Sequence, residues 1–280
     1  MSTLPVDIYS VAAVREIDRT AIEDHGIPGY TLMTRAGAAA VSEARSMFPD
    51  ARRWHVVCGA GNNAGDGYVV ARLAAQEGIV VSVVALVDPG SLKGDAAAAY
   101  RDFAAEGGVV SAWAGQLDAE ADLIVDALLG SGLERDVEGE FALAVAAINS
   151  HPAAVVALDI PTGIHGDTGN VMGFAVRADL TVTFVGLKEG LFLGDGPEYG
   201  GALAFTDLGV PPQCRQALDA AFRRVDDDHM RRTLAPRRRT AHKGDFGHVL
   251  VVGGGPGMPG AVRLCGEAAL RAGAGLVSLA

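Results

Sequence analysis

The chain has 280 residues, of which 49% are hydrophobic and 20% charged, and its formal net charge is −11. A chain of this size can bury one large core or two smaller ones. Its acidic balance gives no general attraction to nucleic-acid phosphates or to anionic membranes, so we expect neither as a partner. We expect a cytoplasmic protein, because no signal peptide and no apolar stretch of the ~20 residues that a membrane span needs is visible.

The predicted elements alternate between helices and strands after two opening helices. In chain order they are helices 10–25 and 30–48, strand 54–58, helix 67–77, strand 79–87, helix 94–106, strand 123–127, helix 138–149 and strands 154–158 and 180–185. Strands separated by helices imply right-handed crossovers. The sequence therefore predicts an α/β fold, a doubly wound, Rossmann-like three-layer sandwich with a mostly parallel sheet.

The composition changes after Val225, which divides the chain into a first domain (1–225), a linker (226–241) and a second segment (242–280). The linker has clustered charges of both signs and a proline, and we interpret Arg237–Arg239 as a solvated part of it rather than as an RNA-binding patch. About 40 residues with one βαβ pattern cannot close a core of their own. We expect the second segment to be an incomplete domain.

Three cysteines, Cys58, Cys214 and Cys265, are odd in number and lack metal-ligand spacing. This pattern favours a reducing compartment and argues against a disulfide framework or a zinc site. We expect Cys58, at a strand end, to act as a small apolar residue.

Three apolar runs end in glycine and oxygen-bearing side chains, at 54–67, 123–132 and 155–163. Such runs are typical of strands buried on both faces in a parallel sheet. Their polar ends then meet at the carboxyl edge of the sheet, where open α/β sheets bind ligands. The sequence therefore predicts a single small-molecule site built from these three segments.

The first of these loops, GAGNNA at 59–64, fits a loose dinucleotide-binding pattern, and Asp88 follows at the distance of a ribose-binding acid. A nicotinamide oxidoreductase is therefore one interpretation. Against it, Asn62, Asn63 and Asp66 lie where a pyrophosphate would approach, and a carboxylate there repels phosphate unless a cation intervenes. Alternatively, Asp66 merely caps a helix that begins near Gly67.

Two aspartates close later strands. Asp126 either caps the following turn or faces a ligand, and the pattern does not decide between these alternatives. Asp159 precedes Ile-Pro-Thr-Gly, so its carboxyl group lies on a rigid strand tip, suited to general acid–base chemistry. A structural aspartate bonded to backbone amides is the alternative. Thr162 adds a hydroxyl group from the same turn.

Taken together, a set of motifs resembles the NAD(P)H-hydrate epimerase family of the YjeF N-terminal type. The motifs, which follow GIPGYTLMTRAG in this order, are CGAGNNAGDGYVVAR, VDALLGSGLERD, LDIPTGIHGDTG and FVGLKEGLFLGDGPEYGG. The resemblance covers about residues 8–225. From His242 on, the chain resembles the opening of the ADP- or ATP-dependent NAD(P)H-hydrate dehydratase domain, which has a ribokinase-like fold, and only that opening, so we expect no dehydratase activity from it.

This resemblance implies an isomerase that interconverts the R and S forms of hydrated NADH and NADPH, called NADHX and NADPHX. It implies Asp159 and Lys188 as catalytic residues, although Lys188 could equally be a solvated turn lysine, and potassium bound by Asn63, Asp126 and Thr162. The implied substrate-binding residues are Asn62, Asn63, Ala64, Gly65, Asp66, Gly130, Ser131, Gly132, Leu133, Glu134, Arg135, Asp136 and Asp159.

Two residues depart from the family pattern, since Thr34 replaces a frequent glutamate and Thr162 replaces the usual serine. Thr162 keeps the hydroxyl group that the cation site needs. A nicotinamide oxidoreductase and a non-catalytic binding module are the alternative functions, and a homodimer is a possible assembly.

Overall fold

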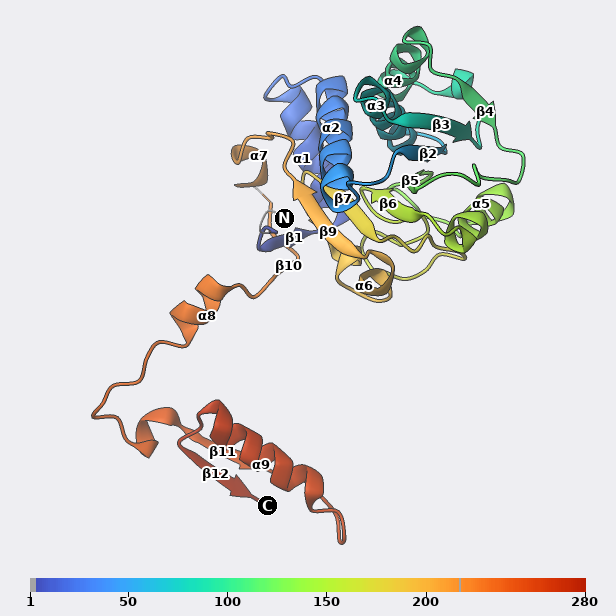
Figure 1. The fold of residues 1–280 in the computed structure, drawn as a ribbon. Helices are drawn as coiled ribbons and strands as arrows, with labels where there is room; N and C mark the ends of the chain where they lie inside the picture. Colours follow the sequence, from blue (N-terminus) through green and yellow to red (C-terminus); the bar gives the residue numbers. More distant parts are fainter. Residues whose placement is uncertain (1–3, 217) are drawn as a thin grey trace. The chain divides into compact units, whose positions relative to one another are not determined.

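The computed structural model describes residues 4–216 and 218–280, and it divides into two compact units, Met1–Arg224 and Val225–Ala280 (Figure 1). The first unit is built on a seven-stranded, wholly parallel sheet with the order β4-β3-β2-β5-β6-β7-β9. Its strands are β2 (Arg53–Cys58), β3 (Val80–Ala85), β4 (Val110–Ala112), β5 (Leu123–Ala127), β6 (Ala154–Leu158), β7 (Leu180–Phe184) and β9 (Ala202–Thr206). The predicted doubly wound sheet is confirmed.

Helices cover both faces of this sheet and give it three layers. One face carries α1 (Val11–Glu23), α2 (Gly29–Met47), α3 (Asn62–Gln76) and α4 (Gly94–Ala105), and the other carries α5 (Gly139–Ser150) (Figure 1). Alternate strand residues enter the two cores: Val56 and Val125 face α1–α4, whereas Val57 and Ile124 face α5. Because both faces are covered, the strands are continuous apolar runs rather than alternating ones.

Helix α1 begins as predicted, with the Ser10 hydroxyl accepting a hydrogen bond from the Ala13 N–H at 3.2 Å. The predicted start of the helix expected at 67–77 was wrong, because this helix, α3, begins at Asn62 rather than near residue 67. Gly61, with φ of +76°, makes the turn from strand to helix. Glycines 65 and 67 suggest a loop in the sequence, but in the structure they allow close helix packing: a Cβ on Gly65 would lie 2.8 Å from the Ala96 Cα.

Several short elements were not predicted. β4 and β9 add to the two edges of the main sheet, and a second sheet has the order β10-β1-β8. The strands of this small sheet are β1 (Asp7–Tyr9), β8 (Leu187–Lys188) and β10 (Phe222–Arg223). In this small sheet, Tyr9 of β1 pairs with Lys188 of β8, and the pairing fixes the position of Lys188. The remaining short helices of the first unit are η1 (Pro89–Ser91), η2 (Glu189–Leu191), α6 (Gly196–Tyr199) and α7 (Gln213–Gln216).

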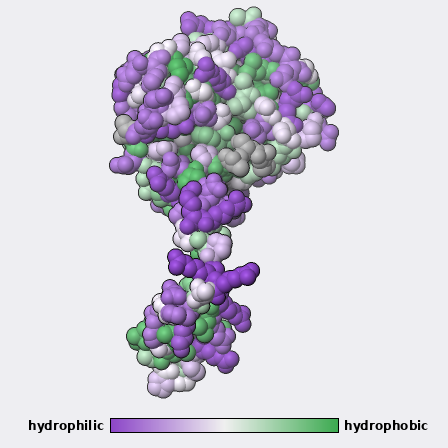
Figure 2. Space-filling model, turned by 90° about the vertical axis from the view of Figure 1, so that its left-hand side faces the viewer, coloured by the Kyte–Doolittle hydropathy of each residue, from purple (hydrophilic) through white to green (hydrophobic). Residues whose placement is uncertain are grey.

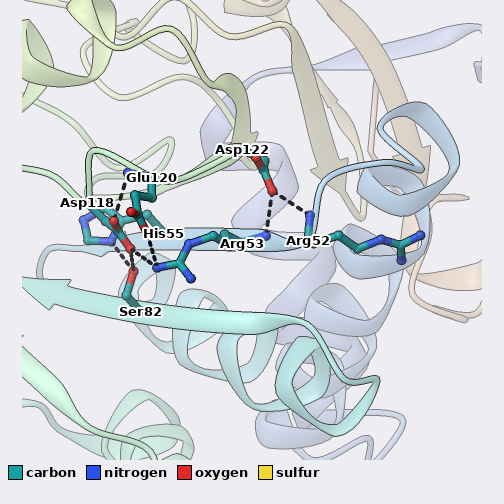
Figure 3. Close-up of polar contacts among 7 residues, drawn as sticks. All are labelled: Arg52, Arg53, His55, Ser82, Asp118, Glu120 and Asp122. Atoms are coloured by element: carbon teal, nitrogen blue, oxygen red, sulfur yellow. Dashed lines mark hydrogen bonds and ion pairs between the residues drawn. The ribbon is translucent and has the colours of Figure 1, made fainter.

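At the amino edge of the main sheet, acidic side chains hold the start of β2 (Figure 3). Asp122 Oδ2 accepts hydrogen bonds from the backbone N–H groups of Arg52 and Arg53 at 2.9 and 3.0 Å. The Arg53 guanidinium pairs with Glu120 at 3.1 Å and with Asp118 at 3.8 Å. These contacts join β2 to the segment that leads into β5.

A second chain of contacts at this edge runs inward from Asp118 (Figure 3). The Ser82 hydroxyl donates to Asp118 Oδ2 at 3.1 Å, and His55 Nδ1 lies 2.7 Å from the same hydroxyl oxygen. Because that hydroxyl donates to Asp118, it accepts from His55, which places the imidazole proton on Nδ1. Burial lowers the pKa of His55, so the ring is neutral at physiological pH.

The second unit consists of α8 (Asp227–Thr233), η3 (Lys243–Phe246), the parallel pair β11 (His248–Val251) and β12 (Leu276–Leu279), and the connecting helix α9 (Gly260–Ala272). Within the segment predicted as a linker, residues 227–233 form α8, which Asp226 caps. Arg237 is exposed, as predicted, and its guanidinium also stacks over the Phe246 ring at 3.9 Å. Large apolar side chains lie exposed on this unit (Figure 2), including Leu250, Val252, Met258 and Leu264. No helix among the described residues combines the length and apolarity that crossing a membrane demands.

Candidate active site

A cavity of about 1340 Å³ opens at the carboxyl edge of the main sheet. The three segments expected to meet there do so, and α1, α2 and the segment around Lys188 also line the cavity. Most of the predicted substrate-binding residues line it: Asn62, Asn63, Asp66, Gly130, Ser131, Gly132, Leu133, Glu134, Arg135, Asp136 and Asp159. Ala64 and Gly65 do not, because they lie on the buried side of α3, where Gly65 packs on Met33 and Ala96.

Asp159 follows β6 directly and adopts the left-handed conformation, with φ of +68°. This conformation is uncommon for a residue with a side chain, and such backbone strain is concentrated at functional sites. The backbone N–H of Asp159 donates to the Val182 carbonyl at 2.8 Å, which continues the sheet pairing to the strand tip. The carboxyl group is thereby turned toward the loop after β5, where Oδ2 accepts a 3.3 Å hydrogen bond from the Ser131 N–H.

Lys188 forms an ion pair with the other carboxylate oxygen of Asp159. Its ammonium group also donates to Thr183 Oγ1 at 3.1 Å and to the Phe184 carbonyl at 2.8 Å, so its three N–H donors are all used. The side chain is only 1% exposed, and the alternative of a solvated turn lysine was therefore wrong. The pairing of β8 with β1, which no local pattern indicates, holds this lysine in the cavity wall.

Two of the other carboxyl groups that line the cavity, those of Asp18 and Asp66, have raised pKa values. Burial raises the pKa of Asp18 on α1 to about 6; the Lys188 ammonium opposes this shift and the Asp159 carboxylate adds to it. Burial, together with the charges of Asp159 and Asp18, also raises the pKa of Asp66 well above its usual range. The charges of Asp18, Asp66 and Asp159 therefore interact with the Lys188 ammonium group, although only Asp159 is hydrogen-bonded to it.

The structure excludes the cap expected for Asp66, because α3 begins four residues earlier and Asp66 lies inside the helix on the cavity side. Sequence reasoning missed Asp18 and Arg15, which also line the cavity. The sequence pattern that could have indicated them is that each directly follows an apolar position of α1: the buried face of this helix includes Val14, Ile17 and Ala21. A Cβ on Gly132 would lie 2.8 Å from the Arg15 guanidinium, so a side chain at this position would clash with Arg15 where it now lies.

Below the cavity, Asp126 is fully buried and bonds to the turn that follows β6. Its Oδ1 accepts from the Thr162 hydroxyl at 2.7 Å and its Oδ2 from the Thr162 N–H at 2.8 Å. Oδ1 also caps the next turn, through the Leu128 N–H at 3.2 Å. Burial raises the pKa of Asp126 to about 6, and among the described residues no cationic side chain pairs with it.

Asn63 lies in the first turn of α3 and is 7% exposed. Neither its amide oxygen nor its amide nitrogen has a hydrogen-bond partner among the residues that the structure describes. A Cβ on Gly130 would lie 3.5 Å from the Asn63 Cγ, so the amide faces the loop that follows β5. A buried amide without partners is costly and indicates that something outside the chain satisfies it.

Other residues that the sequence singled out have structural roles. Asp88 caps η1 by accepting from the Gly90 N–H at 2.9 Å, and it does not line the cavity. Cys58 is buried beneath α3, and burial raises the pKa of its thiol. The Thr34 hydroxyl donates to the Tyr30 carbonyl within α2 at 2.8 Å.

Comparisons with known proteins agree with this architecture. The family model described as YjeF-related protein N-terminus matches residues 29–190. The chain is 42% identical over 275 residues to the bifunctional NAD(P)H-hydrate repair enzyme Nnr of Escherichia coli, covering 98% of this chain and 53% of that protein. It is 43% identical over 273 residues to the enzyme of the same name from Coxiella burnetii, covering 98% and 56%. The chain thus spans about half the length of these curated relatives.

Among solved structures, the crystal structure of the yeast protein YNL200c matches with a TM-score of 0.66. The match covers 79% of this chain and 98% of the yeast chain at 18% sequence identity. At that identity, the likeness supports the fold alone.

Proposed function

Because the chain belongs to the family of YjeF-related protein N-termini, we propose that its cavity interconverts the R and S forms of hydrated NADH and NADPH. The printed names of its relatives supply the class of substrate, NAD(P)H hydrate. The observation that carries the proposal is the strained Asp159, paired with a buried lysine in the wall of a cavity of about 1340 Å³. A cavity of that size accommodates a dinucleotide.

The chemistry follows from the hydrated ring carbon, which bears a hydroxyl group and is bonded to the ring nitrogen. Transfer of a proton to the hydroxyl lets the carbon–oxygen bond break, and water leaves while the nitrogen lone pair stabilises the resulting cation. Water then adds to either face and returns the proton, which gives either epimer. Asp159 exchanges the proton with the hydroxyl group or with the incoming water, and its paired carboxylate also stabilises the cation.

Lys188 contributes by fixing Asp159. Its three hydrogen bonds bind it to Thr183, Phe184 and Asp159 together. Opening of the ring at the same carbon would also invert it, and that route would take a proton from the hydroxyl group and give one to the ring nitrogen as the carbon–nitrogen bond breaks.

The dinucleotide would be held by the start of α3 and by the loop after β5. The free backbone N–H groups at the start of this 15-residue helix favour the pyrophosphate, and Arg15 and Arg135 add positive charge to the same cavity. Glu134 and Asp136 lie along the same wall and offer acceptors for ribose hydroxyl groups or the carboxamide.

We also propose that Asn63, Asp126 and Thr162 hold a potassium ion. Asn63 offers an amide oxygen and Asp126 a buried carboxylate, for which the described part of the chain supplies neither a hydrogen-bond donor to the amide nor a cation to the carboxylate, and Thr162 offers a hydroxyl group. These are hard oxygen donors, which fit such a cation. When bound, potassium would balance the charge of Asp126 and reduce the repulsion of substrate phosphates by the acidic cavity wall.

The proposal is tested by incubating one purified epimer with the chain and separating the two epimers by chromatography. We expect the mixture to approach equilibrium faster than in buffer, without any change in the absorbance of reduced nicotinamide. A redox change with intact NAD(P) would instead favour an oxidoreductase, although the acid that such an enzyme would use, Asp88, is occupied in a cap. Binding of substrate without inversion would indicate a binding module.

A further inference from the structure

We propose that Asp18 is a second proton-transfer residue of the cavity, and that it serves the face of the substrate ring opposite to the one that Asp159 serves. This inference rests on the proposed epimerase function and adds a catalytic role for the N-terminal helix. Inversion by loss and return of water needs proton transfer on both faces of the ring, because water leaves one face and enters the other. A single fixed carboxylate serves one face only.

Asp18 comes from a different element than Asp159. It lies on α1 directly after Ile17, which is fully buried, and α1 is held against the core by Val14 and Ala21. Asp159 lies at the tip of β6 and is fixed through Ser131 and Lys188. Both carboxyl groups line one cavity and are close enough for their charges to interact.

The two carboxyl groups differ in how they are engaged. Asp159 has both oxygens occupied, and Lys188 has no N–H donor left for another acid. Among the described residues, Asp18 has neither a hydrogen bond nor an ion pair, and the charged groups around it are Lys188, Asp159, Asp66 and, on its own helix, Arg15. Burial and the neighbouring Asp159 raise the pKa of Asp18 to about 6, so both of its protonation states are accessible near neutral pH.

This arrangement supplies one acid and one base to a reacting carbon. Glycosidases that invert their substrate use two carboxyl groups in this way, one as acid and one as base, on opposite sides of the sugar ring. The same cavity is lined by Asn63, an amide that is only 7% exposed and has no partner among the described residues, which indicates that this cavity takes up a group from outside the chain.

Protonated Asp18 donates its proton to the hydroxyl group of one epimer, the carbon–oxygen bond breaks, and water leaves with the former bonding pair of electrons. A water molecule on the other face then forms the new carbon–oxygen bond and gives a proton to the Asp159 carboxylate. The opposite direction uses the same two groups with their roles exchanged.

Water labelled with the heavy oxygen isotope distinguishes the two faces. Each purified epimer is incubated in labelled water with the wild-type chain, Asp18→Asn or Asp159→Asn, and both inversion and label uptake are measured by chromatography and mass spectrometry. In both variants, we expect inversion to fall by about 10²-fold or more. In Asp18→Asn, the epimer whose hydroxyl faces Asp159 should still take up label without inverting, and in Asp159→Asn the other epimer should do so.

Glu23→Gln is the matched control, because Glu23 is an exposed acid on the same helix, and it should behave as the wild type. Circular dichroism and thermal melting confirm that each variant is folded. Inversion by Asp18→Asn at the wild-type rate would overturn the proposal. Parallel loss of inversion and of label uptake for both epimers in a folded variant would overturn it too, since both groups would then act on one face. A wild-type chain that inverts neither epimer contradicts the epimerase function itself.

Discussion

The two edges of the main sheet use acidic side chains in opposite ways. At the amino edge, Asp118, Glu120 and Asp122 all have partners (Figure 3), and the pKa of Asp118 is lowered, chiefly by a hydrogen bond from the Glu120 backbone. At the carboxyl edge, burial raises the pKa of Asp18 and Asp66, and the structure gives neither a partner among the described residues.

At the carboxyl edge, the backbone and a neutral side chain are also held in unfavourable states. Asp159 has a left-handed backbone at the carboxyl edge, and the buried amide of Asn63 has no partner in the part of the chain that the structure describes. Natural sequences break local rules mainly at functional sites, where the cost is offset elsewhere. We infer that the contacts at the amino edge stabilise the sheet. At the carboxyl edge, we infer that side chains and backbone are held in unfavourable surroundings, which a bound substrate and a bound cation would make favourable.

The largest effect that this comparison predicts is on Asp159. Asp159→Asn keeps the shape of the side chain and tolerates the left-handed backbone, so we expect the melting temperature to change little. Epimerisation should fall by about 10²–10⁴-fold, because the proton acceptor is lost. The rate of inversion of a purified epimer, measured beside the melting curve, checks this. Turnover within about tenfold of the wild type would remove Asp159 from the mechanism.

Potassium should raise the stability of the first unit. If it binds Asn63, Asp126 and Thr162 in the folded state, a concentration of 100 times its dissociation constant would add about 2.7 kcal/mol to the free energy of unfolding. Melting curves in potassium chloride and in tetramethylammonium chloride of equal ionic strength measure the effect. It should vanish in Asp126→Asn, and equal melting temperatures of the wild type in the two salts would argue against the site.

Asp18→Asn should stabilise the fold at alkaline pH. A folded-state pKa of about 6 lies above that of an unfolded aspartate, so the stability of the wild type falls as the pH rises from about 4 to about 6 and stays low above that. The neutral amide removes this penalty, which we expect to be about 1 kcal/mol near pH 8, since the carboxyl group opens on a solvated cavity, and close to zero near pH 4. Urea unfolding at both pH values measures the difference. A destabilised variant at pH 8 would mean that Asp18 is structural.

At the amino edge we expect an effect on stability and none on turnover. Asp122→Ala removes the acceptor for the Arg52 and Arg53 N–H groups, and because the site is exposed, water replaces it at a cost of about 1 kcal/mol. We expect this loss in the free energy of unfolding while turnover per folded molecule is unchanged. A specific loss of turnover would show that the two edges are not functionally separate.

Much of the fold and the three loops of the cavity could be predicted from the sequence, because buried parallel strands are continuous apolar runs that end in polar residues. The start of α3 could not, since Gly65 and Gly67 indicate a loop locally and their place in the helix depends on packing against other elements. The other residues of the site could not be predicted, because their positions depend on contacts between segments that are far apart in the sequence. The burial of Lys188 depends on β1, from the other end of the first unit. Asp18 stands out only once α1 is placed beside the sheet edge.

The most direct test of the account is the initial rate at which one purified NAD(P)H-hydrate epimer is converted into the other, in potassium buffer, by the wild-type chain, by Asp159→Asn and by Asp122→Ala. The account predicts rapid conversion by the wild type and by Asp122→Ala, and conversion close to the buffer rate by Asp159→Asn. A wild-type rate equal to that of buffer, or equal rates for the two variants, would contradict it.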